Sequence, residues 1–173
     1  MRLPREFIER TSTLLGKDEY EKLETALEQD SPTSNRLNAR KAANHSELMG
    51  SKFLSDQIPW SSIGYYLSDR LTFTFDPLFH AGCYYVQEAS SMFIEQVVRK
   101  YVDKPVIALD LCAAPGGKST HLRSLLPDGS LLVANEVIRN RSQILLENLV
   151  KWGHPDIMVT NNDPSDFSSL TNF

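Results

Sequence analysis

Cysteine is scarce in this 173-residue chain, with Cys83 and Cys112 as its two thiols. Two cysteines are too few for a disulfide framework, and neither has the C-x-x-C or Cys/His spacing of a zinc site, so we expect no metal. Long apolar runs are also lacking, because no stretch approaches the roughly 20 residues that span a bilayer. Residues 1–16 mix charged and apolar side chains, unlike a signal peptide. We therefore expect a cytoplasmic protein without a membrane partner.

An excess of basic charge is lacking as well. Lys and Arg number 18 against 22 Asp and Glu, and the formal net charge is −4. This argues against a highly basic nucleic-acid binder, although the local distribution of charge decides whether a polyanion docks. One stretch is locally basic, with four cations around a single acid and two aromatic residues nearby, and it is either an RNA contact or a solvated surface. Its residues are Arg36, Arg40, Lys41, Glu47, Lys52, Phe53 and Trp60.

Hydrophobic patterning divides the chain into two parts. Within residues 1–76, apolar residues recur at helical spacing in 17–29, and short alternating segments at 34–39, 61–68 and 70–75 favour strands. Within residues 77–173, helical patterns at 88–102, 117–126 and 139–153 alternate with apolar strands at 105–112, 130–136 and 156–163. This alternation predicts an α/β fold: the first three parallel strands of a partial Rossmann-like domain, with crossover helices. We expect helices on both faces of the sheet and a small helical and β subdomain before it.

The loop after the first of these strands reads CAAPGGK, from Cys112 to Lys118. In a doubly wound sheet, the ligand lies beyond the carboxyl ends of the strands. The two glycines permit close approach, and the helix that follows presents free N–H groups to the ligand. A P-loop would need a glycine at Cys112, and Pro115 lacks an amide; adjacent glycines also break the G-x-G-x-x-G pattern. We expect a shorter loop over a nucleoside that bears a compact charged group.

Acidic residues occur at the ends of all three strands, as Asp110, Glu136 and Asp163. Glu136 follows the glycines by about twenty residues, where a doubly wound nucleoside site places an acid against the ribose hydroxyls. Carboxylates around a crevice disfavour phosphate and favour a sulfonium or ammonium group. S-adenosylmethionine (SAM) fits this description, and the alternative for each acid is an ordinary loop residue.

Four segments together resemble the SAM-dependent RNA (cytosine-5) methyltransferase family, and within it the bacterial RsmF-like rRNA methyltransferases. They are CAAPGGKST, VANE, TNND and the upstream GCYYVQEASSM, and the resemblance covers nearly the whole chain. It implies that backbone groups of the loop hold the methionine part of SAM, that Glu136 binds the ribose and that Asp163 lies near the adenine. It also implies that residues 87–92 help to cover the cofactor, where a capped amphipathic helix is the alternative. The implied loop residues are Cys112, Ala113, Ala114, Pro115, Gly116, Gly117 and Lys118.

The family's chemistry uses two cysteines, in a Pro-Cys-Ser motif and a Thr-Cys motif. A thiolate adds to C6 of cytosine and so makes C5 nucleophilic toward the methyl group. Neither motif occurs in the 173 residues, and Cys112 matches a ligand contact rather than the nucleophile. We therefore expect an amino-terminal portion of the enzyme, truncated before catalytic cysteines that lie beyond Phe173. It would bind the cofactor and ribosomal RNA but be inactive by itself.

A sheet that stops after three strands exposes one edge of strand 105–112. We expect the chain to self-associate through this edge or to need a missing half that covers it. Two other functions remain open. One is a non-catalytic RNA-binding or assembly module that keeps the fold without the cofactor, and the other is a P-loop-like nucleotide-binding protein.

Overall fold

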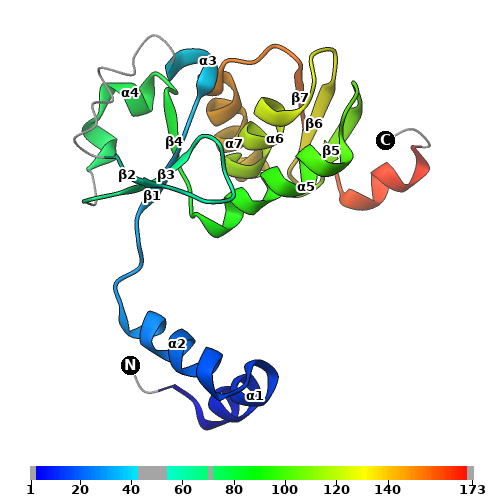
Figure 1. Cartoon of the computed structure of the whole chain (residues 1–173). Helices are drawn as coiled ribbons and strands as arrows, with labels where there is room; N and C mark the ends of the chain where they lie inside the picture. The colour runs from blue at the N-terminus through cyan, green and yellow to red at the C-terminus, as the bar shows by residue number, and fades with distance from the viewer. Residues whose placement is uncertain (1–2, 43–53, 70–71, 171–173) are drawn as a thin grey trace. The chain divides into compact units, whose positions relative to one another are not determined.

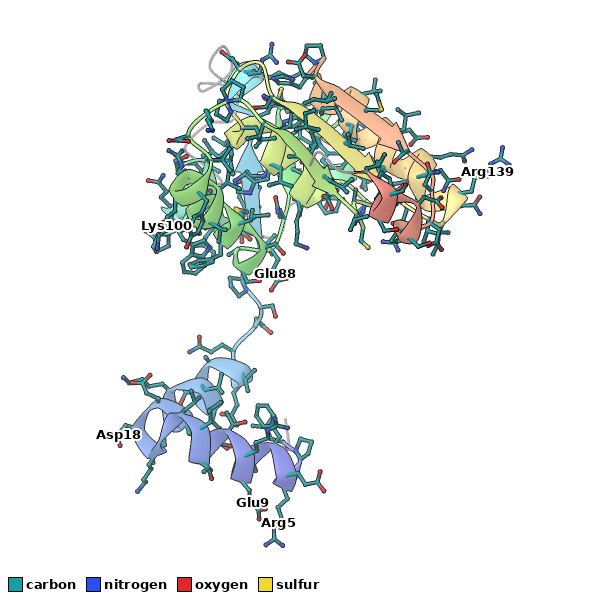
Figure 2. The ribbon with its side chains drawn as sticks, turned by 90° about the vertical axis from the view of Figure 1, so that its right-hand side faces the viewer. Arg5, Glu9, Asp18, Glu88, Lys100 and Arg139 are labelled. Atoms are coloured by element: carbon teal, nitrogen blue, oxygen red, sulfur yellow. The ribbon has the colours of Figure 1, made fainter. Side chains whose placement is uncertain are left out.

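The computed structural model describes residues 3–42, 54–69 and 72–170 (Figure 1). The chain forms two compact units, Met1–Pro32 and Thr33–Phe173. In the first unit, α1 (Arg5–Leu15) packs against α2 (Lys17–Glu28), as predicted for residues 17–29. Gly16, with φ +78°, makes the turn between them, and Arg5 and Glu9 lie side by side on α1 as an exposed ion pair of 2.7 Å (Figure 2).

The second unit begins with an antiparallel four-stranded sheet of order β2-β3-β1-β4. Its strands are β1 (Ser34–Leu37), β2 (Leu54–Gln57), β3 (Gly64–Leu67) and β4 (Tyr84–Val86), with α3 (Ala39–Ala42) after β1. The strand expected at 70–75 is wrong for its described part: Phe73–Phe75 is a short 3₁₀ helix, η1, followed by α4 (Pro77–His80). Because β4 pairs with β1, this sheet extends to residue 86, past the division expected at 76.

A parallel three-stranded sheet of order β5-β6-β7 follows, as predicted. The chain runs through η2 (Ser90–Phe93), α5 (Ile94–Tyr101), β5 (Ile107–Asp110), α6 (Gly117–Leu125), β6 (Leu131–Asn135), α7 (Arg139–Trp152), β7 (Ile157–Thr160) and η3 (Pro164–Ser169). Among the described strands β5 pairs only with β6, so its other edge is open. No helix in the described ranges combines the length and apolarity needed to cross a bilayer.

The helices α5, α6 and α7 cover one face of this sheet. Leu132 packs with residues of α5 and α6, while Ala134 packs with Leu145 and Leu149 of α7. On the opposite face, Ile107 and Met158 are about half exposed. The expectation of helices on both faces is therefore wrong for the described residues. Successive right-handed crossovers that step in one direction, from β5 to β6 to β7, place their helices on the same side.

Two polar side chains, of Asn38 between β1 and α3 and of Lys41 in α3, join the four-stranded sheet to the end of α7. Asn38 Nδ2 donates to the Trp152 carbonyl at 2.9 Å, and Lys41 Nζ donates to the Lys151 carbonyl at 2.7 Å. The last carbonyls of a helix have no partner within it, and a cation there also interacts well with the helix dipole. These contacts complete α7 and hold the two sheets of the second unit together.

Candidate cofactor site

The CAAPGGK loop joins β5 to α6 in a tight turn. Its Ala114–Pro115 peptide is cis, and Gly116 has φ +109° immediately before α6, a left-handed conformation that favours glycine. The Gly116 N–H donates to the Ala113 carbonyl at 2.8 Å. Ala113 and Ala114 are buried, whereas Cys112, Pro115 and Lys118 are exposed. The predicted glycine turn and the predicted start of the helix are confirmed.

This loop lacks the amides of a phosphate cradle. The Ala113 N–H donates to the Asn135 carbonyl at 2.8 Å, the Gly116 N–H is bonded within the loop, and Pro115 has no N–H. The first-turn N–H groups of Gly117, Lys118 and Ser119 have no acceptor within α6, so they are donors that a ligand at the helix start can meet. The geometry therefore disfavours the P-loop alternative and suits one compact polar group at the helix start.

Close packing against Tyr85 favours glycine at position 117, independently of any ligand. A Cβ built there would lie 3.3 Å from Cε1 of Tyr85, which comes from β4. The Tyr85 hydroxyl lies 3.5 Å from the Pro115 carbonyl, and Asn148 Nδ2 of α7 donates to the same carbonyl at 2.8 Å. The loop is thus held from both sides by side chains of the surrounding elements.

Asn135, the last residue of β6, joins all three strand ends. Its Nδ2 donates to the Leu111 and Asn162 carbonyls at 3.2 and 3.0 Å, and its Oδ1 accepts from the Thr160 hydroxyl at 2.9 Å. The side chain is fully buried. Buried amides need such partners, and here they fix the cofactor loop, β6 and β7 at one edge of the sheet. The predicted convergence of the three strand ends is confirmed.

Glu136 follows directly and is only 3% exposed. One carboxylate oxygen accepts the Ile138 N–H at 3.0 Å, and the other lies 3.5 Å from Arg141 Nη1. Arg141 also donates to the Ala114 carbonyl at 2.9 Å, so one guanidinium connects Glu136 with the cofactor loop. The carboxylate therefore lies beside the loop at the carboxyl edge of the sheet.

The other two strand-end acids lie at the same edge of the sheet. Asp110 Oδ2 accepts from the buried Ser119 hydroxyl at 2.7 Å, which ties the end of β5 to α6. Asp163 is exposed, and its Oδ1 accepts from the Ser165 hydroxyl at 2.6 Å and the Ser165 N–H at 2.9 Å. These hydrogen bonds lower the pKa of Asp163, and the bond from the Ser165 hydroxyl has the larger effect. Asp163 therefore caps η3, and a second role toward adenine remains a proposal.

Sequence reasoning missed several residues of this edge. Asn135, Arg141 and Asn161 position the loop and Glu136, with Asn161 Nδ2 donating to the Glu136 carbonyl at 2.6 Å. Val137 and Ile138, each 51% exposed, offer apolar surface next to the acid. Asn135 at the end of an otherwise apolar strand could have indicated this role, because a buried side-chain amide needs hydrogen-bond partners.

Only some side chains of the basic stretch that was a candidate for RNA contact are exposed in the structure. Arg36 is fully buried, so its expected contact with an RNA backbone is wrong. Lys41 is bonded to helix carbonyls, while Arg40 is exposed. Trp60 donates through Nε1 to the Ala89 carbonyl at 2.7 Å, and its ring packs edge-on against Phe93. Three further members of the stretch lie outside the described residues: Glu47, Lys52 and Phe53.

The segment 87–92 is mainly structural in this chain. Gln87 is buried and its Oε1 accepts from Arg36 Nε at 2.8 Å, while Met92 is fully buried. Ser90 Oγ donates to the Glu88 carboxylate at 2.8 Å at the start of the helical stretch. These contacts support the helix interpretation, and a cover over the cofactor stays a proposal.

A cluster of polar and charged side chains around the buried Glu95 joins α5 to α6. Glu95 of α5 accepts from the Ser61 hydroxyl, the Ser62 N–H and Arg99, and lies 3.3 Å from His121 Nε2 of α6. Burial alone would raise the pKa of Glu95, but these hydrogen bonds and the Arg99 charge lower it to about 2. Burial, with the charge of Arg36, lowers the pKa of His121 to about 4. His121 is therefore neutral at pH 7 beside an ionised glutamate.

Two family profiles match the chain. The N-terminal domain of 16S rRNA methyltransferase RsmF matches residues 3–89, and 16S rRNA methyltransferase RsmB/F matches residues 99–172. Ribosomal RNA small subunit methyltransferase F of Aliivibrio salmonicida is 34% identical over 112 residues, which are 62% of this chain and 24% of that protein. The same enzyme of Erwinia tasmaniensis is 29% identical over 168 residues, which are 92% of this chain and 35% of that protein.

Solved structures show the same fold. A methyltransferase homolog protein from Pyrococcus horikoshii is 24% identical with a TM-score of 0.75, over 97% of this chain and 60% of that one. NSun6 from Pyrococcus horikoshii with SFG is 17% identical with a TM-score of 0.75, over 96% of this chain and 67% of that one. The chain thus spans about a quarter to a third of the length of these two curated relatives and two thirds or less of these two solved structures.

Proposed function

Because the chain belongs to the 16S rRNA methyltransferase RsmB/F family, we propose that it supplies the SAM-binding part of an enzyme that methylates C5 of cytosine in ribosomal RNA. The observation that carries the proposal is the arrangement at the sheet edge. The free N–H groups at the start of α6 and the buried Glu136 lie at two neighbouring strand ends, which Asn135 and Arg141 fasten together. This is the donor and acceptor set that a nucleoside with a charged tail requires.

The roles follow from the chemistry of each group. We assign the methionine carboxylate to the N–H groups of Gly117 and Lys118, because a helix start favours negative charge. We assign the ribose hydroxyls to Glu136 and the adenine to the apolar surface of Val137 and Ile138, with Asp163 beside it. When bound, SAM supplies the methyl group. The residues of the chain orient the cofactor and contact it at the loop Cys112, Ala113, Ala114, Pro115, Gly116, Gly117 and Lys118.

Neither thiol of the chain is assigned the nucleophile. Cys83 is buried at 2% exposure, and Cys112 lies in the cofactor loop itself. The sequence contains no Pro-Cys-Ser or Thr-Cys motif, so the proposal assigns both catalytic thiols to polypeptide other than these 173 residues. The chain alone should therefore form no 5-methylcytosine when incubated with 16S rRNA and SAM, as measured by nucleoside mass spectrometry.

RNA contact is proposed for the amino-terminal part, residues 1–76, and cofactor binding for residues 77–173. Arg40 is the exposed cation of the described basic stretch, since Arg36 and Lys41 serve the fold. Arg40→Glu should weaken binding of an rRNA fragment and leave S-adenosylhomocysteine affinity unchanged.

Calorimetric titration of the 173-residue chain tests the cofactor assignment. S-adenosylhomocysteine should bind and Mg-ATP should not, because the loop lacks the phosphate cradle. Binding of Mg-ATP in place of S-adenosylhomocysteine would overturn the assignment. Binding of neither, with RNA binding retained, would favour a non-catalytic RNA-binding module.

A further inference from the structure

Arg36 connects the four-stranded sheet to the cofactor helix. It lies on β1 and is fully buried. One of its Nη atoms, Nη2, donates to the Thr120 hydroxyl at 2.6 Å and to the Gly117 carbonyl at 3.2 Å. Thr120 in turn donates to the same Gly117 carbonyl at 3.0 Å. Three groups therefore converge on the first turn of α6, directly behind the loop.

The guanidinium is a buried cation without a paired carboxylate among the described residues. Its partners are neutral: Gln87 Oε1 at 2.8 Å, the two groups on α6, and the ring of Trp152, whose centroid lies 4.4 Å from Cζ. Nη1 has no acceptor in the described part of the chain. Burial lowers the pKa of Arg36 to about 9, which leaves it charged at neutral pH. Burying a cation is costly, and the electrostatic interactions with Tyr85 and Glu95 offset only part of that cost, because the pKa is still lowered.

Arg36 lies where it can hold the first turn of α6 in place. Its hydrogen bond to the Gly117 carbonyl fixes the peptide unit between Gly117 and Lys118. The N–H of that unit is the Lys118 N–H, and N–H groups in the first turn of a helix point toward its amino end, where the loop lies. The Tyr85 ring holds Gly117 from the other side, 3.3 Å from where a Cβ would be. Small shifts at such a site matter because the donors must meet the ligand within hydrogen-bond geometry.

We propose that Arg36 is a positioning residue for the cofactor loop, acting through Thr120 to hold the first turn of α6 in the conformation that binds the carboxylate of SAM. The inference rests on the proposed function. It gives the four-stranded sheet a part in cofactor binding, because β1 carries the residue that sets the loop.

The test uses Thr120, because valine has the shape of threonine without the hydroxyl. Thr120→Val removes the link through the hydroxyl and leaves the direct bond from Arg36 to the Gly117 carbonyl, whereas Thr120→Ser keeps both. Ser124→Ala is the control: it removes a hydroxyl one turn further along α6, which accepts from Trp152 Nε1 at 3.1 Å and donates to the Thr120 carbonyl at 2.9 Å, and leaves the Thr120 hydroxyl in place. Arg36→Lys keeps the charge but not the paired geometry.

Three quantities are measured on each 173-residue variant: S-adenosylhomocysteine affinity by calorimetry, the free energy of unfolding in urea, and amide hydrogen exchange at 117–120. Thr120→Val and Arg36→Lys should weaken affinity about threefold to tenfold, the loss of one hydrogen bond. Thr120→Ser and Ser124→Ala should stay within about twofold. Thr120→Val and Arg36→Lys proteins that are less stable but bind with unchanged affinity would overturn the proposal.

If the unmodified chain binds no S-adenosylhomocysteine, the cofactor assignment fails, and hydrogen exchange without ligand still tests Arg36. The amide of residue 120 donates to the Gly116 carbonyl at 2.9 Å in the unmodified chain. A lower protection factor for this amide, which corrects for the intrinsic exchange rate of each residue type, in Thr120→Val than in Ser124→Ala supports the positioning role. Equal protection in the two variants contradicts it.

Discussion

Glu136 gives the sharpest test of the ribose assignment. Its carboxylate is 3% exposed, accepts the Ile138 N–H at 3.0 Å and lies 3.5 Å from Arg141. Glu136→Gln keeps the shape and one acceptor oxygen but removes the charge. Glu136→Ala removes the acceptors altogether and leaves Arg141 without this carboxylate. The two variants therefore separate the charge from the hydrogen bond.

The expected magnitudes follow from the kind of hydrogen bond that is lost. A bond to a charged group is worth about 1.5–3 kcal/mol, so Glu136→Ala should weaken S-adenosylhomocysteine binding about tenfold to a hundredfold. A neutral bond retains about 0.5–1.5 kcal/mol, so Glu136→Gln should weaken binding about threefold to tenfold. Calorimetry measures both constants, and thermal unfolding measures how far each variant loses stability.

Glu147→Gln is the control, because Glu147 is exposed on α7 and the same charge is removed away from the site. It should leave the affinity unchanged. If Glu136→Ala bound S-adenosylhomocysteine as tightly as the unmodified chain while remaining folded, the carboxylate would not hold the ribose and the assignment would be refuted.

Three further predictions concern stability and association. Gly116→Ala should lower the free energy of unfolding in urea by about 1–2 kcal/mol, because an L residue is strained in a left-handed conformation and the new Cβ would lie 3.3 Å from Leu145 Cδ1; an unchanged value would contradict the strained turn. Since burial first, and then the charge of Arg36, lowers the pKa of His121 to about 4, the unfolded chain binds a proton between pH 6.5 and 4 that the folded chain does not. The free energy of unfolding should therefore fall by about 1–3 kcal/mol as the pH drops through this window, and His121→Gln should flatten that slope, whereas an equal slope in the variant would exclude His121. Finally, the open edge of β5 and the uncovered face beside it should make the chain self-associate. Ile107→Lys, which places a charge on that face, should reduce the apparent mass in light scattering after size exclusion, and a compact monomer of the unmodified chain at high concentration would contradict the prediction.

Local patterns were sufficient to predict the second half of the fold. Apolar runs between segments of helical period predicted β5 to β7 with α6 and α7. The helical pattern at 139–153 ends at Gly153, which has φ +83° just after α7. The amino-terminal strands were harder, because short segments carry little periodicity. The alternation at 70–75 suggested a strand, but Phe73–Phe75 forms a 3₁₀ helix that leads into the Asp76 cap of α4.

Contacts between residues far apart in the sequence could not be predicted from local patterns. Arg36 looked like a member of a basic surface, since its neighbours Arg40 and Lys41 are cations too. Only the pairing of β1 with β4, and the closeness of both to α6, shows that its guanidinium is enclosed. The adjacent glycines were sufficient to locate the loop at residues 112–118 in the sequence. The role of Asn135, by contrast, depends on contacts with the ends of β5 and β7, which are distant in the sequence.

In the proposed site, one ligand contacts three strand ends at the same edge of the sheet. Amide chemical shifts of the chain during titration with S-adenosylhomocysteine test it directly. The amide signals of residues 112–118, Glu136 and Asp163 should shift together, with a single dissociation constant. Shifts confined to other elements, or a loop that responds to Mg-ATP while Glu136 and Asp163 stay unchanged, would contradict it.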